Sequence, residues 1–509
     1  MRRKHSLTLG AALLAVGSLA LTACSAGSAT PGGSGDSGGS EKTTVTVALT
    51  GEPTNLDFTT TAGAAIPQAV MSNIYEGLVE IDQTGAIQPL LAKSWTVSDD
   101  RKTYTFTLQE GVTFSNGEAF TADDVKFSLE RVKSDAWTSS LKAKMDVVES
   151  VTVVSDTEVA VTLTQPSNAW LFNLGTPVGA MFDESGVADL ANAPVGTGPY
   201  ALDEWKRGDS IVLSTRDDYW GETPAVEGVT LKYFADAVAT TNALKTGDVD
   251  VVYNMQAPEL VDSFASDDAF QVLEGTSSGE ISLSLNNKAA PFDDVRVRQA
   301  VLYAIDEQAI IDTAWNGYGS VVATYAAPTD PYYEDLTDVY KHDPAKAKAL
   351  LKEAGQENLN ITFTVPTRPY ADAVSEIVVS QLKDVGITAT IKSAEFPAVW
   401  IDEVFTKHDY QMTTVLAVEA RDILTVFNNP DYYIGYDNST IAPLAAAADQ
   451  ADEAGYVSGM KQVAKQIVDD AASGVLFLFP NIVVADAALQ GVPENAIIEA
   501  LDLTNLSWK

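Results

Sequence analysis

The sequence predicts an α/β fold with at least two lobes, and three features support this prediction. Residues 44–49 (TVTVAL) and 103–108 (TYTFTL) alternate in side-chain type, as half-buried strands do. Residues 361–391 predict a strand, a helix and a second strand in succession, a βαβ unit that implies a parallel pair of strands. A chain of 509 residues that is 46% hydrophobic has ample apolar material for a sizeable core and is long enough for about three domains.

Strands predominate in the first part of the chain. The turn signal Ser98–Asp100 separates Trp95–Val97 from the strand 103–108, which predicts a hairpin, and residues 151–163 predict a second hairpin. Between the hairpins a helix is predicted to begin after Thr121, because threonine is a favourable N-cap. One face of this helix carries Val125, Leu129 and Val132.

Helices are more frequent in the second half. Asp293 or Asp294 is expected to cap one helix, whose apolar face carries Val297, Val301 and Ile305. A further helix is predicted to begin at Asp343-Pro344, with proline at the first helical position, and to end at Gly355. The βαβ unit is expected to comprise strand 361–365, helix 371–385 and strand 387–391, and an apolar run covers 475–485.

Composition excludes several classes of function. The chain has 32 Lys and Arg against 70 Asp and Glu, a formal charge of -38, so it lacks the basic surface that binds a nucleic acid backbone. One cysteine excludes intrachain disulfides and cysteine-rich zinc sites. Three histidines, one of them His5, argue against histidine-rich metal sites and most histidine-based catalysis. We therefore expect no metal, no cofactor and no nucleic acid partner.

The N-terminus resembles a bacterial lipoprotein signal. Arg2, Arg3 and Lys4 precede an apolar run from Leu7 to about Leu21, which is too short to span a membrane. Leu21-Thr22-Ala23-Cys24 fits the lipobox and contains the only cysteine. The resemblance implies that residues 1–23 are a signal peptide, that cleavage precedes Cys24, and that a lipid on its sulfur anchors the protein. Residues 24–41 are rich in Gly and Ser and are predicted to be a flexible tether.

Two short segments match the sequence motifs of hydrolases, but their positions in the chain do not fit the structures that these motifs require. Residues 35–39 spell GDSGG, as around the nucleophile of trypsin-like proteases, but they lie in the tether and only His5 precedes them. Residues 275–279 fit G-x-S-x-G, whose hydrolase form needs a helix directly after the serine turn. Here alternation resumes at Ile281, which predicts a strand, so we interpret 275–279 as a loop between two strands.

Residues 74–132, IYEGLVEIDQTGAIQPLLAKSWTVSDDRKTYTFTLQEGVTFSNGEAFTADDVKFSLERV, closely resemble the signature region of family-five extracellular solute-binding proteins. These proteins are the peptide and nickel receptors of ABC importers. Further matching pieces follow in the family's order: GTGPYAL at 196–202, DDYWGETP at 217–224, LKTGDVDVV at 244–252, SLNNKAAPFDDVRVRQAVLYAID at 284–306 and PAKAKALLKEAG at 344–355. The resemblance covers the chain from about residue 44 to about residue 485.

The resemblance implies a type II periplasmic-binding-protein fold, α/β, with two lobes around a cleft and an extra domain inserted in one lobe. Domain I would comprise residues 42–80, 195–275 and 483–509. Domain II, the insert, would comprise residues 81–194, and domain III would comprise residues 276–482. The chain would cross between the lobes near 275 and near 483. Such a receptor catalyses nothing; it closes on a solute and delivers it to a permease and ATPase complex in the membrane. We expect it at the outer face of the cell membrane.

In peptide-binding relatives an aspartate shortly after a tryptophan pairs with the N-terminal ammonium of the ligand. The matching stretch here, 409–430, lacks the tryptophan, and either Glu419 or Asp422 matches the anchoring acid. Arg421 between them would favour a ligand carboxylate. Trp400 and Tyr432-Tyr433 are candidates for the walls of the cleft, although packing within a lobe would explain them equally well.

Three alternatives to a peptide receptor stay open from sequence. The same receptor fold can take another solute, such as an oligosaccharide or a chelated metal. A lipid-anchored extracytoplasmic hydrolase is disfavoured because no base and nucleophile are placed together in the sequence. A receptor fold used for adhesion or envelope assembly shares all the features above.

Overall fold

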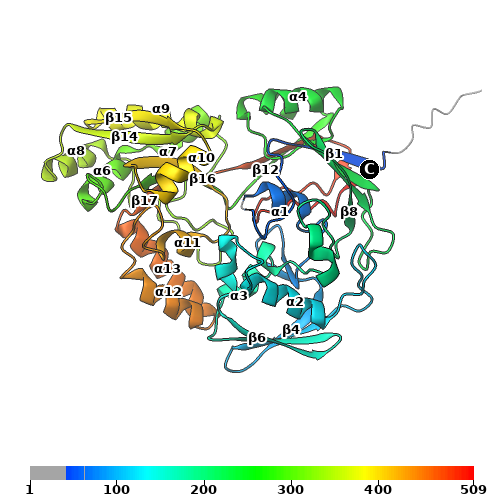
Figure 1. Cartoon of the computed structure of the whole chain (residues 1–509). Coiled ribbons are helices and arrows are strands. Elements are labelled where there is room, and N and C mark those ends of the chain that lie inside the picture. The colour runs from blue at the N-terminus through cyan, green and yellow to red at the C-terminus, as the bar shows by residue number, and fades with distance from the viewer. Residues whose placement is uncertain (1–41, 62) are drawn as a thin grey trace, which may run out of the picture. The chain divides into compact units, whose positions relative to one another are not determined.

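Most strands of the protein belong to sheets of seven, five and four strands (Figure 1). The structure, a computed structural model, describes residues 42–509 except residue 62. The predicted signal, Cys24 and the Gly/Ser-rich tether lie outside these described residues. Residues 42–509 belong to one unit.

The seven-stranded sheet combines distant parts of the chain. Its order is β12-β18-β11-β1-β10-β9-β8, with β1 Thr44–Leu49, β8 Tyr200–Lys206, β9 Ser210–Thr215, β10 Gly228–Tyr233, β11 Val251–Val252, β12 Phe270–Gly275 and β18 Asn481–Asp486. Strand β1 runs parallel to β10 and β11, and the other pairs are antiparallel. The predicted strand 44–49 is confirmed, and its Val45 and Val47 are buried. Helices α1 (Ala65–Val70), α4 (Ala237–Thr246) and α5 (Asp262–Ala265) accompany this sheet.

The four-stranded sheet is antiparallel and has the order β4-β5-β7-β6. Its strands are β4 Ala92–Val97, β5 Thr103–Leu108, β6 Val148–Ser155 and β7 Glu158–Leu163. Both predicted hairpins are confirmed. Helix α2 (Ala122–Lys133) packs on β6 and β7, and Thr121 and Asp124 form a reciprocal capping box at its start. The residues predicted for its inner face are buried, which explains why this helix forms here.

The five-stranded sheet has the order β15-β14-β16-β13-β17. Its strands are β13 Glu280–Leu285, β14 Leu359–Pro366, β15 Ile387–Ala394, β16 Met412–Ala417 and β17 Ser473–Leu478, and helices α6 (Val295–Ala304), α7 (Glu307–Ala314), α8 (Pro344–Glu353) and α9 (Pro369–Asp384) belong to the same part. β14 and β15 pair in parallel around α9, so the predicted βαβ unit is confirmed. Asp294 and Asp343 cap α6 and α8 with their side chains, as two of the predicted helix starts require.

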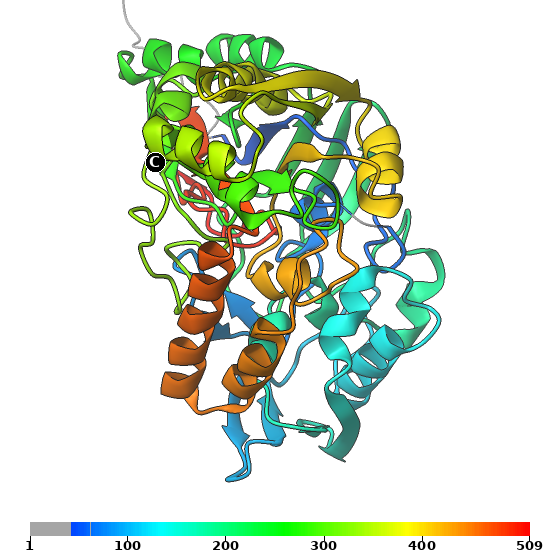
Figure 2. The ribbon, with the colours of Figure 1, turned by 90° about the vertical axis from the view of Figure 1, so that its left-hand side faces the viewer.

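A helix pair extends this part of the chain. Helices α12 (Ile441–Gln450) and α13 (Glu453–Asp469) lie side by side (Figure 2). The remaining short elements are β2 Val79–Ile81, β3 Ile87–Pro89, η1 Ser140–Met145, α3 Ala169–Asn173, η2 Pro177–Gly179, η3 Glu184–Asp189, η4 Pro258–Leu260, α10 Ala398–Trp400, η5 Ile401–Thr406, α11 Ile423–Phe427, β19 Leu489–Gln490 and β20 Ser507–Trp508.

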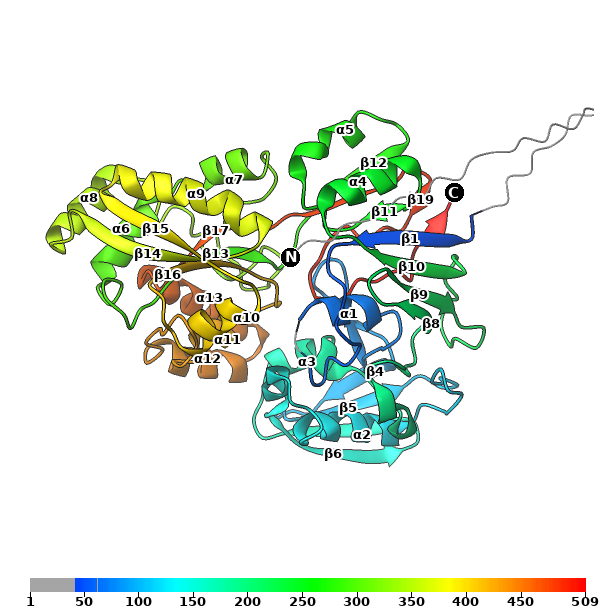
Figure 3. The same cartoon turned by 45° about the horizontal axis from the view of Figure 1, so that its top comes forward.

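Two chain segments connect the seven-stranded sheet with the five-stranded sheet (Figure 3). The first leads from β12 to β13 and contains the G-x-S-x-G string, which is a loop between two strands as interpreted from sequence. The second leads from β17 to β18, so the apolar run 475–485 divides between two sheets. The two crossings are hydrogen-bonded to each other: Ser277 Oγ donates to the Phe479 carbonyl at 2.5 Å, and the Phe479 amide donates to the Gly279 carbonyl at 2.7 Å.

The hydrophobic cores follow the same division. One core joins the seven-stranded and four-stranded sheets, whereas the five-stranded sheet and the helix pair have cores of their own. We call residues 42–275 and 481–509 the first lobe, and residues 280–478 the second lobe. Among the described residues, no helix is both long and apolar enough to span a membrane.

Candidate functional site

The loop after β16 brings Glu419 against the first lobe. β16 ends at Ala417, and the Glu419 carboxylate lies 2.8 Å from the ammonium of Lys144, which belongs to η1 of the first lobe. The Lys144 and Glu419 side chains are only 19% and 32% exposed, so solvent screens this ion pair less than a pair on the open surface. The pair therefore connects the two lobes.

Arg421 makes a second connection between the lobes. Its backbone is left-handed, with φ of 56°. Its Nε lies 3.3 Å from a carboxylate oxygen of Asp330 in the second lobe, and its guanidinium lies 3.6 Å from the ring centre of Phe172 in α3 of the first lobe. A guanidinium at this distance from an aromatic face is held by a cation–π attraction of about 0.5–2 kcal/mol. The charge of Arg421 is thus already compensated within the protein.

Asp422 and Glu280 are buried acids in the same region. They are 4% and 3% exposed. Burial, followed by the fields of Glu419 and Asp330, raises the pKa of Asp422 well above its ordinary value. Burial, followed by the fields of Asp422 and Asp330, does the same to the pKa of Glu280. One carboxyl oxygen of Glu280 has no hydrogen-bond partner among the described residues, which is costly in a protein interior.

Glu499 contributes a further acid from the C-terminal segment of the first lobe. Its side chain is partly buried. The pKa of Glu499 is raised to about 7, chiefly by burial; the negative charge of Glu419 contributes to this rise, and the positive charge of Lys144 opposes it. The pair formed by Lys144 and Glu419 therefore lies within the electrostatic reach of both Glu499 and Asp422. We call Glu280, Asp330, Glu419, Asp422 and Glu499, together with Lys144 and Arg421, the inter-lobe cluster.

The predicted aromatic residues lie in the second lobe. Trp400 is 4% exposed, and its indole Nε1 donates to Thr413 Oγ1 at 3.0 Å. Its ring packs edge-on against Tyr433 at 5.7 Å, and the Tyr433 hydroxyl lies 3.2 Å from Ser284 Oγ. Tyr432 is partly buried and stacks beside Tyr433 at 4.9 Å. Trp400 and Tyr433 thus pack within the lobe. The pKa of the Tyr432 hydroxyl is raised mainly by burial, next by Tyr433 and then by the negative charge of Asp422.

Other contacts also hold the lobes together. Asn168, just before α3 of the first lobe, donates through its side-chain amide to the carbonyls of Asp449 and Ala451 at 2.7 and 2.8 Å. The backbone amide of Asn168 donates to the Asp449 carboxylate at 2.9 Å. Arg101 in the first lobe donates to the Gln450 carbonyl at 3.0 Å. The end of α12 is therefore docked on the first lobe, and the structure has its lobes in contact.

Sequence reasoning named the loop 419–422 but missed its partners. Lys144, Phe172 and Asp330 are distant in sequence and carry no motif, so only the fold brings them to the loop. The sequence could have identified Glu280 as unusual, because it is a charged residue at the start of a strand whose six residues are all buried. A glutamate that begins a fully buried strand is an outlier against the usual exposure of this residue type.

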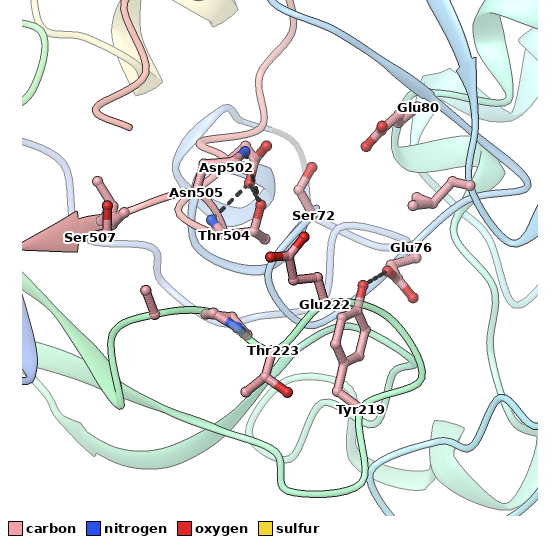
Figure 4. A pocket seen from close by; sticks show the side chains of 14 residues that line it. Ser72, Glu76, Glu80, Tyr219, Glu222, Thr223, Asp502, Thr504, Asn505 and Ser507 are labelled. Atoms are coloured by element: carbon pink, nitrogen blue, oxygen red, sulfur yellow. Dashed lines mark hydrogen bonds between the residues drawn. The ribbon is translucent and has the colours of Figure 1, made fainter. Parts of the chain in front are cut away.

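A separate pocket lies within the first lobe (Figure 4). It encloses about 380 Å³ between the segment after α1, the loop after β9 and the C-terminal segment, and it contains none of the predicted site residues. Its acids include Glu76, Glu80, Glu222 and Asp502. Glu76 is satisfied internally, since its carboxylate accepts from Tyr219 at 2.8 Å and from the Trp220 indole at 3.0 Å. Burial raises the pKa of Glu80 to about 7, helped by the negative charges of Asp502 and Glu76.

Within the part of the chain that the structure describes, no three His, Cys, Asp or Glu side chains come together in a way that could hold a metal ion.

Two α/β lobes joined by two crossings, with charged and aromatic side chains of both lobes in contact, define a two-lobed solute-binding protein. The family profile "Bacterial extracellular solute-binding proteins, family 5 Middle" matches residues 86–440. The chain belongs to this family, as the sequence resemblance implied. The predicted α/β fold of the type II periplasmic binding proteins is also confirmed.

Known relatives agree with this assignment. The nickel-binding periplasmic protein of Escherichia coli K12 is 30% identical over 357 residues, which cover 65% of this chain and 67% of that protein. The glutathione-binding protein GsiB of Salmonella paratyphi A is 32% identical over 349 residues, 66% of each chain. This chain thus spans about two thirds of the length of these curated relatives. The binding protein DppA of Helicobacter pylori, solved with the peptide STSA, shares the fold with a TM-score of 0.80 at 22% identity, over 91% of this chain and 98% of that one.

Proposed function

We propose that this protein is the receptor of an ABC importer that captures di- or oligopeptides between its two lobes and delivers them to a membrane permease. The observation that carries the proposal is Asp422: a buried carboxyl where the lobes meet, with no cation paired to it among the described residues. Family membership supports the receptor role. The glutathione-binding relative and the fold neighbour that holds a peptide support a peptide as the ligand.

The chemistry of Asp422 suits the ammonium group of a peptide. A buried carboxyl without a cation is costly when ionised and takes up a proton instead. A bound ammonium supplies both the charge and the N–H donors that the carboxylate lacks. Ligand contacts made only when the lobes are together would shift the protein toward the closed form. The ligand leaves chemically unchanged, because a receptor needs differential binding between two shapes and no bond cleavage.

The domain division predicted from sequence is part of this proposal. Domain I (42–80, 195–275 and 483–509) would carry the seven-stranded sheet, domain II (81–194) the four-stranded sheet, and domain III (276–482) the five-stranded sheet. The placement of the sheets along the chain supports this division. Closure would then turn about the two crossings that follow β12 and β17.

Attachment to the membrane is likewise proposed. A lipid on Cys24 would hold the receptor at the outer face of the membrane, near its permease and ATPase, and so raise their effective concentration. The lipobox at 21–24 and the polar segment after it support this idea. Detergent phase partition of the full-length protein tests the lipid anchor. The wild-type protein should enter the detergent phase and Cys24→Ser should not; a wild-type protein that stays in the aqueous phase would exclude the anchor.

A thermal-shift screen of peptides, oligosaccharides and metal chelates tests the ligand class. A peptide present at 100 times its Kd should stabilise the protein by about 2.7 kcal/mol. Asp422→Asn should lose most of this stabilisation, whereas Asp431→Asn, at an exposed acid of the same lobe, should keep it. A shift produced only by oligosaccharides or only by chelates would overturn the peptide assignment and leave the receptor role intact.

A further inference from the structure

The carboxyl end of α12 in the second lobe takes its hydrogen-bond donors from the first lobe. The last carbonyls of a helix have no partner within the helix, and α12 has no basic residue in its last turn to serve them. The side-chain amide of Asn168 donates to the carbonyls of Asp449 and Ala451 at 2.7 and 2.8 Å. The Arg101 guanidinium donates to the Gln450 carbonyl at 3.0 Å. First-lobe side chains therefore cap this helix.

The capping is reciprocal, because the second lobe also caps α3 of the first lobe (Figure 1). The residue before α3 makes no side-chain capping bond to it, and the first turn of α3 contains no acid. The Asp449 carboxylate accepts instead from the backbone amides of Asn168 and Ala169, at 2.9 and 3.0 Å. An acceptor for the first amides of a helix normally comes from the residue just before that helix. Here it comes from the opposite lobe.

The position of Asp449 is unfavourable for its own helix. Asp449 lies in the last turn of α12, where the partial negative charge of the helix dipole repels a carboxylate. The two amides at the start of α3 offset this repulsion, and they belong to the other lobe. Asp449 therefore stabilises the protein through the contact between the lobes and destabilises α12 without that contact.

Arg101 holds Asn168 in the orientation that the cap needs. It follows the tight turn between β4 and β5, with a left-handed backbone of φ 58° and its amide donating to the Ser98 carbonyl at 2.8 Å. Its guanidinium also donates to Asn168 Oδ1 at 3.2 Å. Because Arg101 engages the oxygen of the Asn168 amide, the nitrogen is left to serve the α12 carbonyls. Both residues are in the first lobe, so this bond does not need contact between the lobes.

We propose that Asn168, Arg101 and Asp449 form a latch in which each lobe supplies the cap that a helix of the other lobe lacks. The last turn of α12 and the first turn of α3 are then fully hydrogen-bonded only while the lobes are in contact, which couples the order of these helix ends to closure. The latch consists of protein groups outside the inter-lobe cluster, so it engages without ligand and is independent of the peptide assignment. A closed form that is already populated lowers the cost of closing on a ligand.

Hydrogen exchange of the ligand-free full protein, measured by mass spectrometry, tests the latch. Asn168→Ala in the first lobe should speed exchange of the amides at 447–451 in the second lobe by about fivefold, as expected for the loss of a helix cap. Asp449→Ala in the second lobe should speed exchange at 168–170 in the first lobe to a similar extent. Each measured segment keeps its own sequence, so a faster rate reports the lost contact with the other lobe.

Two variants serve as matched controls. Asn242→Ala removes an exposed asparagine from α4 of the first lobe. Asp384→Ala removes an exposed aspartate from the end of α9 in the second lobe. Neither should change exchange at 447–451 or at 168–170. Unchanged exchange across the lobes in both Asn168→Ala and Asp449→Ala would overturn the latch.

The separation of the lobes distinguishes a latch from mere support of two helix ends. Spin labels on cysteines introduced at the exposed Val154 and Val295, in a Cys24→Ser background, report this separation. Asn168→Ala should raise the ratio of open to closed molecules about fivefold, and Asn242→Ala should leave it unchanged. Faster exchange with unchanged label distances would overturn the coupling to closure. Failure of peptides to bind would overturn the proposed function and leave the latch standing.

Discussion

Lys144 and Glu419 lie 2.8 Å apart and join the 3-10 turn η1 of the first lobe to the loop after β16 of the second. This relationship gives the closed form an interaction that an open form would lack. A partly buried pair of this kind contributes about 1 kcal/mol. The pair is therefore strong enough to bias the two lobes toward contact without locking them together.

Lys144→Met should shift the ligand-free protein toward the open form by about fivefold in the ratio of open to closed molecules. Glu419→Gln should do the same, and the double variant should add little, because both single changes remove one interaction. Spin labels at the exposed Val154 and Val295, one in each lobe, in a Cys24→Ser background would report the distribution of distances. Unchanged distributions in both single variants would show that the pair does not contribute to closure.

Arg421→Gln should destabilise the protein by about 3 kcal/mol at pH 8, because it leaves Asp330 buried without its cation. The sign of the pH effect follows from Asp330. Without Arg421 its folded-state pKa rises further above its unfolded value, so the cost grows as pH rises and is smaller at pH 5. Denaturant unfolding at the two pH values measures this. Lys341→Gln, at an exposed pair, should change stability by less than about 0.5 kcal/mol, and an equal loss in both variants would contradict the account.

Glu80→Gln should stabilise the protein at pH 8 and have no effect at pH 4. Burial and the negative charges of Asp502, Glu76 and Asp82 raise the pKa of Glu80 to about 7. A carboxyl whose folded pKa exceeds its unfolded pKa costs stability as pH rises from the unfolded value to the folded one. Thermal unfolding across this range checks the prediction against Glu222→Gln, an exposed acid of the same pocket. Identical pH profiles for the two variants would speak against a buried, protonated Glu80.

Gly275→Ala should destabilise the protein by about 1–3 kcal/mol and disturb closure. A Cβ at this position, where β12 leads into the first crossing, would lie 1.8 Å from the carbonyl oxygen of Glu494, so the backbone must shift. Gly51→Ala meets nothing within 4 Å and should be neutral or slightly stabilising. Denaturant unfolding and peptide titration of both variants measure the two effects. If Gly275→Ala changed neither stability nor peptide affinity, the close packing at the crossing would be contradicted.

Local signals were enough to predict much of the fold. The alternation in 44–49 and 103–108, the cap at Thr121 and the βαβ unit at 361–391 are encoded by near neighbours, and the structure confirms all of them. The crossing at 276–279 was also foreseen as a loop, because alternation resumes directly after Gly279.

The candidate site was harder to predict because its interactions are between distant residues. The sequence limited the anchoring acid to Glu419 or Asp422, but their environments differ through partners that no local pattern reveals. Glu419 forms an ion pair with Lys144 from the other lobe, whereas Asp422 is buried and its negative charge raises the pKa of Glu280. The role predicted for Arg421, to favour a ligand carboxylate, stays a prediction; in this structure its guanidinium contacts Asp330 and Phe172, which no local pattern reveals.

Native mass spectrometry of the intact protein mixed with Ala-Lys tests the central claim most directly. The account predicts one added peptide mass per chain, greatly reduced in Asp422→Asn, and recovery of the dipeptide uncleaved. Absence of any peptide adduct, or recovery of free alanine and lysine in place of the dipeptide, would contradict a receptor that encloses a peptide between its lobes and releases it unchanged.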